Sequence, residues 1–97
     1  MALALYTTLT ISCDPSEEYS GPTIIHSTGV QAYRVAPEVI RILQETFTND
    51  RLCDHERGVQ CFDPVSSVIQ AFENAGFEVA SNHETDDLKM WTIIKTN

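Results

Sequence analysis

The sequence predicts an α+β fold: a single six-stranded, mainly antiparallel sheet with two helices packed on one of its faces. Two segments repeat apolar residues at helical spacing, which predicts the helices. Six further segments are rich in β-branched or alternating apolar residues, which predicts the strands. The expected order is three strands, a helix, a strand, a helix and two strands. Because 97 residues suffice for only one domain, we expect residues 1–97 to fold as a unit.

The N-terminal part of the chain supplies the first three predicted strands. From Leu3 to Cys13, leucine and isoleucine alternate with tyrosine, threonine and serine, which is the pattern of a half-buried strand. A loop of turn-forming residues follows and ends in Gly21-Pro22, where glycine tolerates a positive φ and proline fixes the next φ. We expect two short strands after this loop, at Thr23 to His26 and at Val30 to Val35.

Each predicted helix has a recognisable start. The first is expected to begin at Pro37, where the acidic Glu38 suits the positive end of the helix dipole. The second is expected to begin with Asp63 as its side-chain cap and Pro64 at the first helical position, and to stop before Gly76. The expected buried faces are Val39, Ile40, Leu43 and Phe47 in the first helix and Val65, Val68, Ile69 and Phe72 in the second.

The segments around the second helix complete the predicted sheet. Asn49 to Arg57 is polar and is predicted to be a loop, whereas Gly58 to Phe62 is predicted to be a short strand. After the helix, Phe77 to Ser81 and Leu88 to Lys95 are predicted strands joined by a turn at Glu84 to Asp87. Because this turn is short, the last two strands must be antiparallel.

The composition argues against several classes of protein. A net charge of −8 disfavours nucleic acid as a partner, because phosphate binding needs clustered Lys and Arg. No apolar run approaches the ~20 residues that cross a bilayer, and the first residues lack the basic start of a signal peptide. The three cysteines, Cys13, Cys53 and Cys61, are therefore expected to be reduced thiols. We expect a soluble cytoplasmic protein, with the nucleus left open as a second compartment.

The sequence contains no recognisable catalytic or metal-binding motif. Cys53 and His55 lie close to Asp54 and Glu56, but a structural zinc site requires four ligands at repeating spacings, so a solvated loop is the better interpretation. Asp86-Asp87 lies at a hairpin tip, where aspartate is favoured by turns in any case. We therefore expect no catalytic residues, no cofactor and no metal.

One group of large apolar residues has no obvious place beneath the helices. We expect these residues on the uncovered face of the sheet, where other copies of the chain would bury them. The long first strand favours the same interpretation, because an unprotected edge strand invites pairing with a neighbour. The expected oligomer interface consists of Tyr6, Tyr33, Trp91 and Ile93.

Several short motifs occur in order along nearly the whole chain. They are Ile11-Ser12, Gly21-Pro22-Thr23, Pro37-Glu38, Asp63-Pro64, Gly76-Phe77 with Val79 and Ser81, and Trp91 with Lys95. Their order and spacing, from about Leu5 to Thr96, resemble the GTP cyclohydrolase I feedback regulatory protein family. No single motif carries the resemblance.

The resemblance implies a non-enzymatic regulator. Members of this family form ring-shaped pentamers, and two pentamers clamp the faces of a decameric GTP cyclohydrolase I. The complex is inhibited by tetrahydrobiopterin and stimulated by L-phenylalanine, so both are possible effectors at the partner interface. The family fold, a six-stranded sheet with two helices, agrees with the fold expected above.

The resemblance also implies which residues face the partner, namely the loop after the first strand and the tip of the last hairpin. In this chain they are Ile11, Ser12, Cys13, Gly21, Pro22, Thr23, Thr85, Asp86, Asp87 and Leu88. The hairpin departs from the family pattern, which has glycine and glutamine where this chain has Asp86-Asp87. A carboxylate is unfavourable beside the carboxylate of an amino acid, so phenylalanine sensing is left open.

Two other functions are left open by the sequence. One is a free-standing small-molecule sensor of the ACT type, which would share the α+β layout but have no cyclohydrolase partner. The other is a small enzyme that uses His83 with Asp86 or Asp87, which would require these groups to converge in a pocket.

Overall fold

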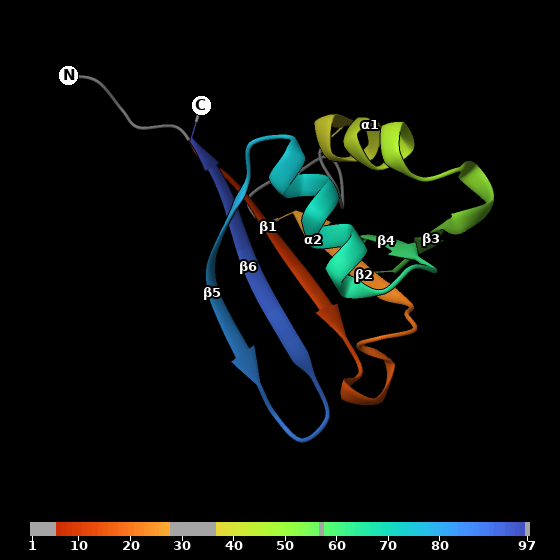
Figure 1. The fold of residues 1–97 in the computed structure, drawn as a ribbon, viewed down its shortest axis with the longest axis vertical. Helices are drawn as coiled ribbons and strands as arrows, with labels where there is room; N and C mark the ends of the chain where they lie inside the picture. Colours follow the sequence, from red (N-terminus) through yellow and green to blue (C-terminus); the bar gives the residue numbers. More distant parts are fainter. Residues whose placement is uncertain (1–5, 28–36, 57, 97) are drawn as a thin grey trace.

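A computed structural model describes residues 6–27, 37–56 and 58–96. The described strands form one sheet in the order β3-β4-β2-β1-β6-β5, with every neighbouring pair antiparallel. The strands are β1 (Tyr6–Cys13), β2 (Thr23–Ser27), β3 (Leu52–His55), β4 (Gly58–Cys61), β5 (Glu78–Glu84) and β6 (Lys89–Thr96). The helices α1 (Pro37–Thr46) and α2 (Val65–Asn74) cover one face of the sheet (Figure 1). The predicted α+β fold is confirmed.

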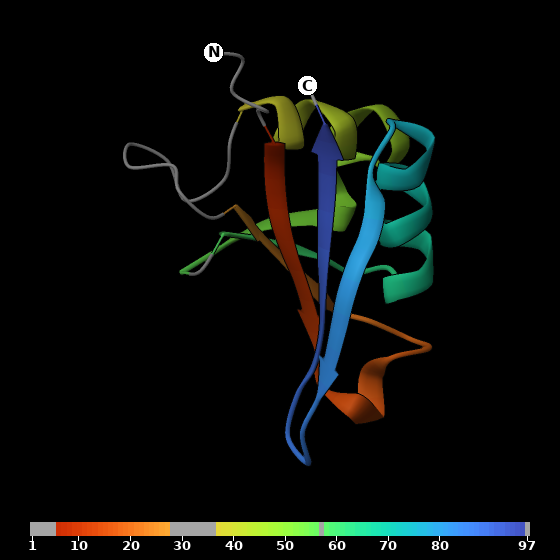
Figure 2. The same ribbon diagram turned by 90° about the vertical axis from the view of Figure 1, so that its left-hand side faces the viewer.

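The sheet is strongly twisted. The three long strands β1, β6 and β5 run side by side, while β4 and β3 cross behind them at a wide angle (Figure 2). Such a twist follows from the right-handed twist of each strand. The two helices fill the hollow of the curved sheet, and the β5–β6 hairpin extends beyond them at the opposite end from the C-terminus (Figure 1).

The core lies between the helices and the sheet. Phe72 of α2 is fully buried at its centre, and its ring meets that of Phe77 edge-on at a centroid distance of 5.4 Å. The other fully buried large residues are Leu9, Ile11, Ile25, Val39, Leu43, Val68 and Ile93. In α1, Ile42 is buried and Ile40 is 37% exposed, so the prediction that Ile40 belongs to the buried face is wrong. The helix is rotated so that residues 39, 42 and 43 face the sheet.

One described strand lies where the sequence predicts a loop. Residues 52–55 were expected in a polar loop, yet they form β3, which pairs with β4 in the register Leu52↔Cys61 to His55↔Gly58. An edge strand has one paired side only and needs few apolar residues, which explains its polar composition. The strand predicted at Val30 to Val35 lies outside the described residues.

The start of α2 also differs from the prediction. The helix begins at Val65, and Pro64 precedes it as a cap without a side-chain hydrogen bond. Asp63 does not cap the helix, because its carboxylate binds Arg51, with Nε–Oδ2 and Nη2–Oδ1 distances of 3.3 Å each. A positively charged guanidinium outcompetes the backbone amides for this carboxylate. After α2, Gly76 has a φ of +100°, as expected for a glycine that ends a helix.

The register of β6 decides which of its residues face the core. Ile93 pairs with Leu9 and Trp91 pairs with Ile11, so both lie on the helix-covered face. The prediction that Trp91 and Ile93 lie on the uncovered face is therefore wrong: Ile93 is buried in the core and Trp91 packs against it. Tyr6 pairs with Thr96 at the end of β1, and Tyr33 lies outside the described residues.

The uncovered face of the sheet carries small hydroxyl side chains in its centre. Register places Thr10 and Ser12 of β1 there, and both are buried by their strand neighbours. The surrounding positions on this face are Thr8, Ile24, His26, Met90, Thr92 and Ile94. Among residues 6–27, 37–56 and 58–96, neither helix has the length and apolar character needed to cross a membrane.

Candidate functional site

Two segments far apart in the sequence meet at one end of the molecule. We call this end the hairpin end and define it as residues 14–22 together with residues 82–91. The first segment connects β1 to β2, and the second contains the ends of β5 and β6 with the turn between them. Both lie at the bottom of Figure 1. They overlap the two segments that the family resemblance assigns to the partner interface, the loop from Ser12 to Thr23 and the hairpin tip from Thr85 to Leu88.

The loop 14–22 is organised by its own polar groups. Oδ1 of Asp14 accepts hydrogen bonds from the backbone N–H of Ser16 at 2.9 Å and from its hydroxyl at 2.6 Å. These bonds lower the pKa of Asp14, because they stabilise the carboxylate. They cap a short 3₁₀ helix, Pro15–Glu17, in which no residue is buried. The Glu17 carbonyl then accepts a bond from Gly21 N–H at 2.8 Å, which closes the loop.

The loop ends against the segment that precedes α2. Gly21 has a φ of +80°, and a Cβ at this position would lie 2.7 Å from the carbonyl oxygen of Asp63. The hydroxyl of Thr23 donates to the same oxygen at 3.0 Å, and Thr23 is fully buried. Gly21 and Thr23 therefore fix where the loop leaves the core. The peptide bond between Gly21 and Pro22 is cis.

Four of the residues assigned to the partner interface have little surface to offer. Ile11 and Cys13 belong to the core, Thr23 is buried beside Asp63, and Ser12 is buried on the other face of the sheet. These side chains hold the loop in place and lie beneath the surface that a partner would contact.

The tip of the β5–β6 hairpin is exposed and is organised by Thr85. Thr85 N–H donates to the Leu88 carbonyl at 2.8 Å, and its hydroxyl accepts a bond from Leu88 N–H at 3.1 Å. The same hydroxyl accepts a bond from Asp87 N–H at 3.4 Å. This arrangement leaves the side chains of Asp86 and Asp87 exposed at the tip. Asp86, Asp87 and His83 all belong to this one exposed hairpin, so no element of the described chain encloses them.

A single lysine joins the two segments of the hairpin end. Nζ of Lys89 binds the carboxylate of Glu18 and lies 3.5 Å from Oε1 of Glu84. These contacts, above all the hydrogen bond to Glu18, raise the pKa of Lys89. Beside it lies a small hollow of about 140 Å³, lined by Asn82, His83, Glu84, Lys89, Met90 and Trp91.

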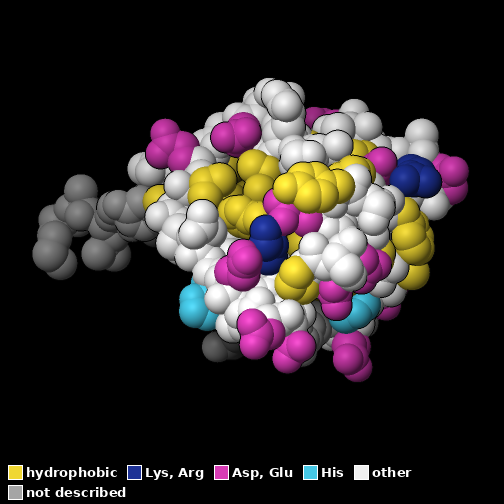
Figure 3. Space-filling model, turned by 60° about the horizontal axis from the view of Figure 1, so that its bottom comes forward, with side chains coloured by type: hydrophobic (Ala, Val, Ile, Leu, Met, Phe, Trp, Pro, Cys, Tyr) yellow, Lys and Arg dark blue, Asp and Glu magenta, His cyan; other side chains and the backbone are white. Residues whose placement is uncertain are grey.

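The surface of the hairpin end combines apolar and acidic groups. Figure 3 turns this end toward the viewer and shows hydrophobic side chains gathered beside a basic group that acidic groups surround. Tyr19 is 86% exposed. The acidic residues at this end are Asp14, Glu17, Glu18, Glu84, Asp86 and Asp87. Lys89 is the only lysine or arginine within the two segments, against six acidic residues, so the local charge is strongly negative.

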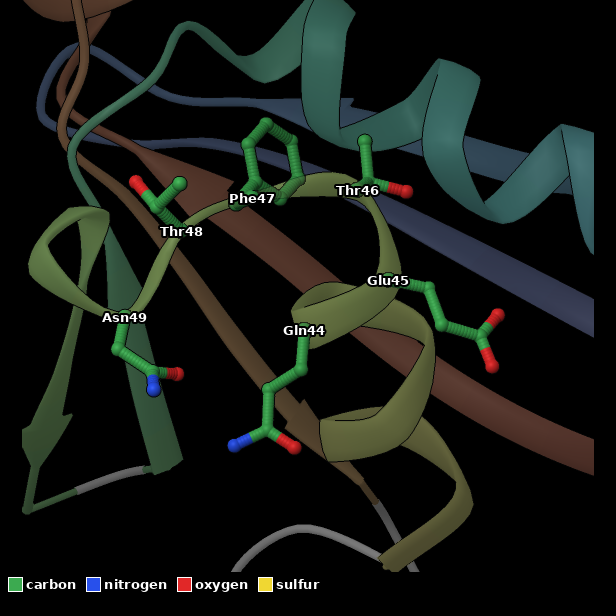
Figure 4. A pocket seen from close by; sticks show the side chains of 6 residues that line it. All are labelled: Gln44, Glu45, Thr46, Phe47, Thr48 and Asn49. Atoms are coloured by element: carbon green, nitrogen blue, oxygen red, sulfur yellow. The ribbon is translucent and has the colours of Figure 1, made fainter.

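Two larger hollows of the described chain lie elsewhere. One of about 520 Å³ surrounds the end of α1 and is lined by residues 44–49. Figure 4 shows Gln44 and Asn49 reaching toward the same side, while Phe47 points away from them and packs against the core. A second hollow of about 310 Å³ lies between α1 and β3. Neither contains a cluster of titratable groups arranged for catalysis.

The described residues contain no group of three or more His, Cys, Asp or Glu side chains able to hold a metal ion. Cys53 and His55 alternate with Asp54 along β3, so register places Asp54 on the opposite face from the other two. The Cys53 to Glu56 run thus does not gather its side chains at one point.

The three thiols should differ strongly in reactivity. Cys53 is exposed, whereas Cys13 and Cys61 are buried. Burial raises the pKa of Cys61 to about 11 and also raises that of Cys13, so neither forms much thiolate at about pH 8. With a chromogenic disulfide reagent, we expect one rapid thiol per chain in the folded protein and three after unfolding. Cys53→Ser should abolish the rapid reaction, and any rapid thiol that remains in that variant would contradict the buried placement of Cys13 and Cys61.

Comparison with protein-family models and with curated proteins found no match for this chain. Its function is therefore argued from the hairpin end and from the motifs described above.

Proposed function

We propose that this protein is a non-enzymatic regulatory subunit that binds GTP cyclohydrolase I through the hairpin end. The observation that carries the proposal is the meeting of loop 14–22 with the β5–β6 hairpin, bridged by Lys89 and Glu18. The resemblance assigns these two segments to one partner interface, which requires that they be neighbours in space. The sheet and helix arrangement is also the one that the resemblance implies.

Regulation would operate through linkage. A regulator shifts an enzyme between two states only by binding one of them more tightly than the other. Tetrahydrobiopterin would inhibit by stabilising the complex with the less active state, and L-phenylalanine would stimulate by stabilising the other. A difference in affinity of ~1–3 kcal/mol is enough for a useful change in enzyme activity.

The acidic tip of the hairpin should favour the response to one effector over the response to the other. Asp86 and Asp87 are exposed there and would repel the carboxylate of an amino acid. Tetrahydrobiopterin has no carboxylate and does not meet this repulsion. We therefore propose that the response to tetrahydrobiopterin is the stronger of the two.

The proposal includes assembly into a ring of five subunits. Two features of the described chain support assembly. Strand β5 is an edge strand whose residues are all exposed, including Val79. The uncovered face of the sheet places Ile24, Met90 and Ile94 around the central hydroxyl groups. Neither surface includes Trp91 or Ile93, which lie on the covered face, so both surfaces could still contact another subunit.

The test is binding to purified GTP cyclohydrolase I without effector, with L-phenylalanine and with tetrahydrobiopterin. Complex formation and the subunit mass are read by size-exclusion chromatography with light scattering. We expect a five-subunit mass for the protein alone and a complex that is most stable with tetrahydrobiopterin. Absence of a complex under all three conditions would refute the proposal, and a dimeric mass would then favour a free-standing sensor.

A charge reversal tests whether the hairpin end is the contact surface. Asp87→Lys at the tip should weaken the complex, because it changes the charge in the middle of the proposed interface. Glu73→Lys is the matched control, since Glu73 is also exposed but lies on α2 near its C-terminal end. Equal loss of binding in both variants would show that overall charge, and not this surface, controls the association.

A further inference from the structure

Loop 14–22 has few contacts that hold it to the rest of the molecule. Its 3₁₀ helix contains no buried residue, and its hydrogen bonds from Ser16, Ser20 and Gly21 are made within the loop itself. A loop without apolar anchors cannot offset the entropy of ordering by burial. It therefore needs specific contacts at its ends and near its middle.

One such contact lies at each end of the loop. At the start, Cys13 belongs to β1 and is buried in the core. At the finish, Gly21 packs against the carbonyl of Asp63. Between these points, the ion pair from Glu18 to Lys89 joins residues that are 71 positions apart in the chain.

This ion pair is partly shielded from water. The side chains of Lys89 and Glu18 are only 24% and 19% exposed, so water screens their attraction weakly. On the hairpin side, Lys89 stands opposite Glu84 in the strand register and also contacts its carboxylate, which is 59% exposed. The lysine is thus held by its own hairpin and reaches from there to the loop.

We infer that Lys89 is a positioning residue whose ammonium group holds loop 14–22 against the β5–β6 hairpin, so that the hairpin end is one preformed surface. Without it, the loop is tethered at its two ends only, and its middle opens while the core stays folded. The effect on partner affinity rests on the proposed function, because an ordered surface binds without a further entropic cost. The order of the loop itself does not depend on that proposal.

The test is hydrogen–deuterium exchange of the intact protein, read on peptides that cover residues 14–22. In Lys89→Met, we expect the amides of this segment, including those of Ser20 and Gly21, to exchange about fivefold faster or more than in the wild type. Peptides from α2 should be unchanged, which shows that the fold persists. Lys89→Arg keeps the cation and should restore most of the protection.

The chain offers a matched control, because its two lysines both lie in β6. Lys95 pairs with Glu38 at 3.4 Å and lies near the other end of the strand. Lys95→Met removes the same charge but should leave exchange in the loop unchanged. Equal exchange in Lys89→Met and Lys95→Met would overturn the inference. Glu18→Gln is a second variant that should also speed exchange in the loop. Combining it with Lys89→Met should increase the exchange rate little further, since the two residues act on each other.

The binding experiment separates this inference from the proposed function. If wild-type protein fails to bind GTP cyclohydrolase I but Lys89→Met still loosens the loop, the proposed function is wrong and the role of Lys89 holds. If wild-type protein binds the enzyme and Lys89→Met leaves the loop unchanged, the role of Lys89 is wrong and the proposed function holds.

Discussion

Replacing Phe72 with alanine is expected to lower the free energy of unfolding by about 3–5 kcal/mol. Phe72 is fully buried where α2 meets the sheet, and its ring contacts Phe77. Truncation removes the largest buried side chain of the core and leaves a cavity that strands and helix cannot fill by a small movement. Domains of this size have a total stability of about 5–15 kcal/mol, so the variant should lose a large share of its stability.

Urea unfolding followed by circular dichroism and by the fluorescence of Trp91, the single tryptophan, measures this change. Gln70→Ala is the matched control, because Gln70 lies on the exposed side of the same helix. We expect the control to change stability by less than about 0.5 kcal/mol. A loss below about 1 kcal/mol in Phe72→Ala would contradict the central position of this ring in the core.

The second large effect is expected at Gly21. Alanine at this position must adopt a φ of +80°, which costs an L-residue about 1–2 kcal/mol. Its Cβ would also lie 2.7 Å from the Asp63 carbonyl oxygen, a backbone atom that cannot rotate away. The loop and the start of α2 would have to separate. We therefore expect Gly21→Ala to destabilise the protein by about 2 kcal/mol or more.

Gly76→Ala has the backbone cost without the close approach, so the difference between the two variants measures the cost of the close approach. Gly76 has a φ of +100°, but the nearest atom to an added Cβ is Cε of the flexible Lys95 side chain, at 3.5 Å. Only the backbone cost of about 1–2 kcal/mol should then apply. Urea unfolding measures the loss of unfolding free energy in each variant. If Gly76→Ala destabilised the protein as much as Gly21→Ala, the contact of the added Cβ with Asp63 would contribute nothing to the destabilisation.

The elements that the sequence predicts correctly are those with a strong local signal. Both helices have an apolar stripe at helical spacing, and the first strand alternates over eight described residues. The short strand β3 gives no such signal, because Leu52–His55 contains one aliphatic residue and lies at an edge. It is a strand because its backbone pairs with β4. Local sequence composition does not contain that information.

The faces of β6 could not be assigned from its sequence for a related reason. Apolar residues occur on both faces, with Trp91 and Ile93 on one and Met90 and Ile94 on the other. Alternation therefore cannot say which set is buried. Register with β1 decides the question, because Leu9 stands opposite Ile93.

The sequence predicts turns in the two segments of the hairpin end, and only the family resemblance assigns them to a partner interface. The turn signals of Gly21-Pro22 and Asp86-Asp87 locate the two segments of the hairpin end. The bond between Glu18 and Lys89 depends on the path of a loop that no periodicity describes. The one available clue was that the chain has only two lysines, both near the ends of the same strand.

The order of the strands has a consequence for how the protein is made. Strand β1 lies in the middle of the sheet, yet its long pairing with β6 joins residues 6–13 to residues 89–96. During synthesis, β1 leaves the ribosome before the intervening elements from β2 to β5 and must wait for all of them before this partner exists. Pairing between distant segments is also slow to form. Until β6 emerges, one edge of the central strand β1 therefore lacks its partner, and the described sheet is completed only when β6 is made.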